Sequence, residues 1–347
     1  MLSLARFIGY AILGIATLEV AARIDDRVSA GASILKPYSI NDLFQPSRFG
    51  REGKPNANFG KWSMNGLGYR GPNPVSGRIT VAVFGASESF GLYETANHEY
   101  PRQLEAALNE EGTTPRFNVV NLALPGARVG RWGYLVEGIE KTHARVVVIY
   151  PSPANYIGTT EPLCGKPTRP VPNDIGILDH LRVRGKVEQL MKRSIPLEAL
   201  TVFRKYSIWA QSRNMVVVDR VPEATIEAFK TDMRCAAEAA HRAGAKVVFA
   251  THATYFGTTV KSSDEPMVVA WRRFYPELGE SGFIDLERRA NAALMQVGRE
   301  MNVAVVDASA KIPRGPGYFA DFVHFTDAGA LQMATLLKPA VESLLRQ

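Results

Sequence analysis

The 347-residue sequence contains only two cysteines, Cys164 and Cys235, which is too few for a small fold built on disulfides. They are compatible with one bridge in an exported protein and equally with two buried free thiols. The sequence also lacks a CxxC pair, an HExxH motif and a histidine cluster. We therefore expect no metal site and no cofactor.

The charges of the chain form no dense block. Its 41 basic and 34 acidic residues are scattered along the sequence and give a net charge of +7. A protein that binds duplex nucleic acid normally has a clustered basic face, so we expect no nucleic-acid partner. An anionic surface or an anionic substrate stays open.

The sequence also lacks a phosphate-binding loop. A small-residue turn, GASESFG, follows the apolar run Ile79–Gly85. Its glycines do not have the GxGxxG spacing of a dinucleotide site, and Leu92 stands where a phosphate loop needs lysine. The segment is therefore either a simple tight turn or a turn that positions a nucleophile.

An apolar segment lies near the N-terminus. Sixteen residues between Arg6 and Arg23 contain one charge, that of Glu19. This length lies between that of a secretory signal and that of a full membrane span. We predict that residues 1–29 are a single-pass inner-membrane anchor with the rest of the chain in the periplasm. A signal cleaved after the small residues Ala21 and Ala22, giving a secreted or periplasmic protein, and a buried helix are the alternatives.

The remaining chain divides into two parts. Residues 30–77, rich in Pro, Gly, Asn and Ser, are predicted to be a connector and irregular lead-in. From residue 78 to 347 short apolar strands alternate with helices. The strands are expected within 79–85, 117–126, 144–153, 245–254 and 302–309, and the helices at 100–112, 130–141, 222–243 and 283–301. This alternation predicts a doubly wound α/β domain with a parallel sheet. An insertion at 159–220 is predicted to be a lid or cap near the carboxyl ends of the strands.

A serine and a histidine–aspartate pair suggest nucleophilic chemistry. A serine hydroxyl needs a histidine base that a third group orients. Asp321 lies three residues before His324, within reach of its imidazole. This chemistry has two plain alternatives. Ser87 could be a helix cap, and Asp321 and His324 could be a structural cap pair. The other histidines, His98, His143, His180, His241 and His252, are predicted to be surface or packing residues, and Glu88 to be solvated or at a helix start.

Two further strand ends offer hydrogen-bond donors for an oxyanion. Gly126 follows the second predicted strand and could present its backbone N–H, while Asn155 follows the third and could present its side-chain amide. Each could also be an ordinary turn residue. The order Ser87, Gly126, Asn155 and Asp321–His324 follows the order of the predicted strands.

In these four blocks, spread over about 78–347, the sequence resembles the SGNH (GDSL-like) hydrolase superfamily. The resemblance implies a three-layer α/β/α, flavodoxin-like fold. It also implies Ser87 as nucleophile rather than Ser89. Asp321 and His324 complete the implied triad, and the N–H of Ser87, the N–H of Gly126 and the side chain of Asn155 form an oxyanion hole. Two departures stand out: Ala86 replaces the usual Asp, and the third block reads PANY instead of Gly-x-Asn-Asp.

The resemblance and the predicted export together imply a serine esterase that removes acyl groups, expected to be O-acetyl groups, from an extracytoplasmic glycan. The partners expected are an acylated small molecule or glycan and the membrane, with the oligomeric state left open. An O-acetyltransferase with the same residues is one alternative. An inactive glycan-binding or assembly scaffold is another, and lipid or thioester hydrolysis is a third.

Overall fold

A five-stranded parallel sheet forms the centre of the computed structural model, which describes residues 2–36, 38–110, 114–167, 169–170, 181–213, 215–257 and 260–346. Its strands are β5 (Ile79–Gly85), β6 (Phe117–Asn121), β7 (Ala144–Tyr150), β8 (Lys246–Ala250) and β9 (Ala304–Val306). They lie in the order β6-β5-β7-β8-β9, all parallel. In chain order this is 2-1-3-4-5, the flavodoxin-like arrangement, with its switch point between β5 and β7. The predicted fold class is confirmed.

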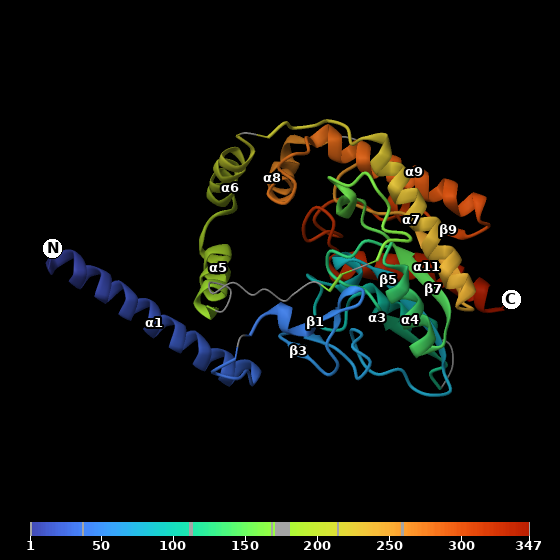
Figure 1. The fold of residues 1–347 in the computed structure, drawn as a ribbon, viewed down its shortest axis with the longest axis horizontal. Helices are drawn as coiled ribbons and strands as arrows, with labels where there is room; N and C mark the ends of the chain where they lie inside the picture. The colour runs from blue at the N-terminus through green and yellow to red at the C-terminus, as the bar shows by residue number, and fades with distance from the viewer. Residues whose placement is uncertain are drawn as a thin grey trace.

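Helices cover both faces of the sheet and make three layers (Figure 1). Val81 and Val83 of β5 pack with α3 (Tyr100–Leu108) and α11 (Asp327–Arg346). Ala82 and Phe84 point to the other face, toward α4 (Trp132–Thr142), α7 (Glu223–Arg242) and α9 (Glu280–Glu300). Because successive residues of a strand face opposite sides, the continuous apolar run of β5 is what burial on both faces requires.

The predicted helices begin and end close to their observed positions, and each strand lies within its predicted range, but β6, β8 and β9 are clearly shorter than those ranges. The strand expected at 302–309 is limited to β9, because Asp307 caps a short helix, α10 (Ala308–Lys311), by accepting a hydrogen bond from the Ala310 N–H. The predicted end of the helix at Gly112 lies outside the described residues. The remaining elements of the domain are α2 (Ser87–Phe90), α8 (Glu265–Arg272) and the 3₁₀ turns η1 (Ile40–Leu43), η2 (Pro153–Tyr156) and η4 (Ser262–Asp264).

The lead-in packs on the domain through two small hairpins. They pair β1 (Phe44–Ser47) with β2 (Gly50–Gly53) and β3 (Asn58–Phe59) with β4 (Trp62–Ser63). Leu43, Phe44, Met64 and Tyr69 are buried in the same cluster as α4 and α7. The Arg70 N–H donates to the Asn121 carbonyl at the end of β6. The lead-in therefore lies beside the carboxyl ends of the strands.

The N-terminal helix α1 (Leu2–Ala30) extends away from the domain (Figure 1). Residues Arg6–Ala30 are long and apolar enough to cross a membrane by length and composition. The described part of the insertion contains α5 (Arg182–Ser194), which lies against α1, and α6 (Leu197–Ser212), which lies against α8. The part of the insertion at 171–180, including His180, lies outside the described residues.

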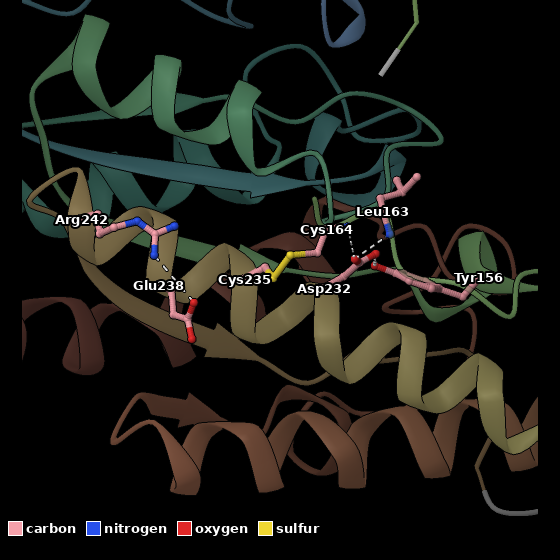
Figure 2. The surroundings of a disulfide bond; sticks show 7 residues. All are labelled: Tyr156, Leu163, Cys164, Asp232, Cys235, Glu238 and Arg242. Carbon is pink, nitrogen blue, oxygen red and sulfur yellow. Dashed lines mark hydrogen bonds and ion pairs between the residues drawn. A yellow bond between two sulfur atoms is a disulfide. The ribbon is translucent and has the colours of Figure 1, made fainter. Parts of the chain in front are cut away.

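A disulfide joins the start of the insertion to α7 (Figure 2). The Cα atoms of Cys164 and Cys235 are 6.2 Å apart. Beside the bond, the fully buried Asp232 accepts hydrogen bonds from the N–H groups of Leu163 (2.8 Å) and Cys164 (2.9 Å) and from the hydroxyl of Tyr156 (2.9 Å). Of the two alternatives for the cysteines, the structure thus has the bridge.

Candidate active site

Ser87 lies at the carboxyl end of β5, at the switch point of the sheet. It is the first residue of the one-turn helix α2, whose N-cap is Ala86, so Ser87 is not a helix cap. As the first helical residue, its N–H has no acceptor within the helix. The turn is tight: a Cβ on Gly85 would lie 2.2 Å from the Ser89 Oγ, which only glycine avoids. The small residues of GASES thus hold one hydroxyl and one N–H at the sheet edge.

Asp321 and His324 form a bonded pair in the loop before α11. Asp321 Oδ2 accepts a hydrogen bond from His324 Nδ1 at 2.8 Å, while its Oδ1 accepts from the N–H groups of Val323 (2.9 Å) and His324 (2.8 Å). The carboxylate therefore fixes the loop and the imidazole together. In the neutral ring, with Nδ1 donating to Asp321, the lone pair is on Nε2, and this buried atom has no hydrogen-bond partner among the described residues.

The loops after β6 and β7 lie next to the Ser87 turn. The Leu124 N–H donates to the Gly85 carbonyl (3.2 Å), and Asn155 Nδ2 donates to the Ala127 carbonyl (3.0 Å). Gly126, between these two contacts, is exposed and has φ +72°, a conformation that favours glycine. Its N–H donates no hydrogen bond within the described chain. Asn155 keeps a second amide N–H after its bond to Ala127.

A buried carboxylate–imidazole–carboxylate chain, which the sequence does not predict, begins next to Ser87. Of the two alternatives for Glu88, the helix start is confirmed, since Glu88 lies in the first turn of α2, and exposure to solvent is wrong. Its Oε2 accepts a hydrogen bond from Ser87 Oγ and its Oε1 contacts His252 Nε2, both at 3.2 Å. His252 Nδ1 contacts Glu287 Oε2 at 2.8 Å. His252 lies two residues after the end of β8. The rule that functional polar residues gather at the carboxyl ends of strands would therefore have indicated His252 as a site residue.

The charges of this chain stabilise one another. Burial disfavours an imidazolium, but Glu287 and Glu88 outweigh that cost and raise the pKa of His252. Burial also disfavours the Glu88 carboxylate, and the hydrogen bond and charge of His252 reverse this and lower its pKa. The pair is therefore ionised near neutral pH, and Ser87 donates its hydroxyl to a carboxylate that stays charged.

The pKa of His324 is affected by the charge of Glu88 as well. Burial lowers its pKa, but the hydrogen bond and charge of Asp321, together with the charges of Glu88 and Glu94, outweigh burial, and the net pKa is raised. Burial itself raises the pKa of Glu94 to about 7. The electrostatic effect of Glu88 on His324 links the Ser87 turn with the Asp321–His324 loop. No direct hydrogen bond joins Ser87 and His324 in the part of the chain described here.

Among the described residues no group of three or more His, Cys, Asp and Glu side chains is arranged to hold a metal ion. The arrangement instead offers a hydroxyl, an oriented imidazole and two unengaged backbone N–H groups at one edge of the sheet. Such groups can carry out nucleophilic attack on a carbonyl.

The chain is similar to solved structures of ester hydrolases. A lipase/acylhydrolase from Enterococcus faecalis is 14% identical, with a TM-score of 0.44 over 76% of this chain and 96% of that one. The acetyl xylan esterase AlAXEase is 14% identical (TM-score 0.45, 76% and 100%). A GDSL-like lipase from Bacteroides thetaiotaomicron is 14% identical (TM-score 0.41, 78% and 91%). No family model and no curated protein matches the sequence. Identity and TM-score are both low, so these neighbours assign no role to a residue of this chain.

Proposed function

We propose that this protein is a serine esterase that cleaves ester-linked acyl groups, with Ser87 as nucleophile, His324 as general base and Asp321 as the group that orients His324. The observation that carries the proposal is the unpartnered, buried Nε2 of His324, whose ring is held by Asp321 in the tautomer that a base requires.

The reaction starts with a change of partner. The Ser87 hydroxyl, bonded to Glu88 in this structure, rotates toward His324 Nε2. His324 removes the proton as Oγ attacks the ester carbonyl, and Asp321 stabilises the imidazolium. The N–H groups of Ser87 and Gly126 and the amide of Asn155 stabilise the oxyanion. The ester oxygen leaves with the proton from His324, and water then releases the acyl group from Ser87 by the same steps in reverse order.

The location of the protein is part of the proposal. The helix α1 continues without a break past the possible cleavage site at Ala22, and residues on both sides of that site bind the insertion. The Glu19 carboxylate accepts the Val183 N–H at 3.0 Å, and Asp26 pairs with Lys186 at 2.8 Å. These contacts favour an uncleaved inner-membrane anchor, and the disulfide suits the oxidising periplasm. The substrate that fits this location is an O-acetylated glycan outside the cytoplasm.

The anchor is tested by the mass of the intact protein purified from membranes. A mass that includes residues 1–22 is expected. A mature chain that begins after Ala22 would show that the segment is a cleaved signal.

The chemistry is tested by labelling with a fluorophosphonate probe and by turnover of p-nitrophenyl acetate. Ser87→Ala is expected to abolish labelling and to lower kcat by roughly 10⁴-fold or more. Ser89→Ala is the matched control: Ser89 is buried and bonded to the Tyr100 hydroxyl at 2.7 Å, so its loss affects stability by about 1 kcal/mol and leaves labelling intact. A folded wild-type protein with no Ser87-dependent labelling would instead be a binding scaffold.

An acyltransferase would use the same residues. Turnover of an acetylated glycan in the presence of a second, unacetylated glycan separates the two activities. Release of free acetate supports the esterase, and transfer of the acetyl group to the second glycan supports the acyltransferase.

A further inference from the structure

Three arginines surround the loop that carries Gly126. Arg51, in β2, donates a hydrogen bond from Nη2 to the Pro125 carbonyl, directly before Gly126. Arg128 donates from Nη1 to Thr159 Oγ1 at 2.8 Å. Arg131 stands at the end of the loop, where its guanidinium lies 3.3 Å from the position that a Cβ on Gly50 would occupy. One of the three arginines thus comes from the lead-in, and the other two come from the segment that follows Gly126.

Aromatic rings hold two of these guanidinium groups in place. Arg51 lies 4.6 Å from the centroid of the Phe44 ring, and Arg128 lies 5.4 Å from that of Tyr156. Contacts of this kind fix a guanidinium without neutralising it. Both charges are therefore held in position and are not neutralised by these contacts.

The arginines lack balancing carboxylates. None of the three forms an ion pair with another of the described residues, and the buried Nε of Arg131 has no hydrogen-bond partner. Burial and the charges of Arg51 and Arg128 lower the pKa of Arg131, and no carboxylate opposes them. The charge of Arg128 affects the pKa of one buried carboxylate, that of Asp232. Asp232 already accepts three hydrogen bonds from other groups (Figure 2).

We infer that Arg51, Arg128 and Arg131 form a binding site for a negatively charged group, a carboxylate or phosphate, on the sugar that carries the scissile acyl ester. This inference rests on the proposed function for its location, since it makes the site a specificity determinant beside the oxyanion donors. Guanidinium groups match carboxylate and phosphate oxygens in paired hydrogen bonds, and three like charges that form no ion pair with the described residues are stabilised when an anion binds among them. The substrate class is thus an acylated anionic glycan rather than a neutral one.

The test measures binding and does not depend on catalysis. Full-length Ser87→Ala protein in a sugar-free, neutral detergent is titrated with tetragalacturonate, with glucose 6-phosphate and with neutral xylotetraose by isothermal calorimetry. We expect at least one anionic ligand to bind about 10-fold or more tightly than xylotetraose, with an affinity that falls as salt is raised from 50 to 300 mM. The tighter of the two anionic ligands identifies the group as carboxylate or phosphate.

Two variants and a control attribute the binding to the arginines. Arg131→Gln and Arg128→Gln are each expected to weaken the anionic ligand about 10-fold or more and to leave xylotetraose unchanged. Arg145→Gln is the matched control, because Arg145 is an exposed arginine near the amino end of β7, at the opposite edge of the sheet. If Arg131→Gln lowers the melting temperature, Arg131→Lys, which keeps the charge, should restore both folding and most of the binding.

Equal affinity for neutral and anionic ligands, or anionic binding that neither arginine variant changes, would overturn the inference. Failure of the proposed function is a separate result: it would show as absent Ser87-dependent labelling, while the arginines could still bind an anion. An active esterase without anion preference would refute only the arginine site.

Discussion

Replacement of His252 by glutamine tests whether the buried chain of Glu88, His252 and Glu287 stabilises the fold as an ion pair. His252 is fully buried between two carboxylates, which raise its pKa to about 10. A rise from about 6.5 to that value corresponds to an upper limit of about 5 kcal/mol. Removal of one partner of a buried pair costs about 3–5 kcal/mol in general, because it leaves an uncompensated charge. At roughly 2–4 °C per kcal/mol, His252→Gln should lower the melting temperature by roughly 6–20 °C at pH 6.

The pH dependence of this loss distinguishes an ion pair from a packing defect. A group whose pKa is higher in the folded state stabilises fully below its unfolded pKa, and this contribution is lost as the pH rises toward the folded value. The contribution of His252 is therefore complete at pH 6 and fades between about pH 6.5 and pH 10. Glu88, whose pKa is lowered, contributes above its ordinary pKa of 4.5 and loses that contribution only at more acidic pH.

Thermal unfolding of the full-length protein, followed by tryptophan fluorescence at pH 6 and pH 9, measures both effects. The gap between wild type and His252→Gln should narrow strongly at pH 9. The exposed His241 on α7 supplies the control, since His241→Gln should leave the melting temperature within 2 °C at both values. A gap below 2 °C at pH 6, or an equal gap at both pH values, would refute the ion-pair account.

Three further perturbations have defined outcomes. Joint replacement of Cys164 and Cys235 by serine should lower the free energy of unfolding by up to roughly 4 kcal/mol, because the closed loop spans 71 residues; an unchanged denaturation midpoint would argue against the bond. The acid limb of kcat/KM for ester hydrolysis should lie above pH 6.5, because the base form of His324 predominates only above its raised pKa. Asp321→Asn should move that limb to lower pH and reduce kcat by roughly 10³-fold or more, and an unmoved limb would separate Asp321 from His324. Gly126→Ala has room for its methyl group but must adopt φ +72° at a cost of about 1–2 kcal/mol, so kcat should fall about 10-fold with little change in KM.

The fold class could be predicted from the sequence because its strands are buried on both faces. The runs at 79–85 and 144–150 are apolar without alternation, and the spacing between them requires helical crossovers. The predicted length of the last strand is too great because the chain after 304–306 turns into a helix that Asp307 caps. The local hydrogen bond of this cap does not show in the periodicity of the sequence.

Individual hydrogen bonds of the candidate site could be predicted from sequence only where the two residues are close in the chain. Asp321 and His324 are three residues apart, and their bond follows from that spacing. Glu88 and His252 are 164 residues apart, and a pairing over that distance depends on which strands are neighbours in the sheet. The grouping of the three arginines around the Gly126 loop could not be predicted for the same reason, since Arg51 comes from the hairpins of the lead-in.

The attachment of α5 to α1 has a geometric consequence for a protein anchored in a bilayer. A helix of 29 residues is about 44 Å long, while the hydrocarbon core is about 30 Å thick, so about nine residues of α1 would project from a bilayer that the helix crosses. Near the end of α1, Lys186 pairs with Asp25 and Asp26, and in the segment that follows the helix the Lys36 carbonyl accepts a hydrogen bond from Arg182 at 2.8 Å. In a protein anchored in this way, the contacts of the insertion would limit how far the domain can move relative to α1. Such an enzyme would work at a set height above the lipid surface and would select substrates by their distance from the membrane as well as by their chemistry.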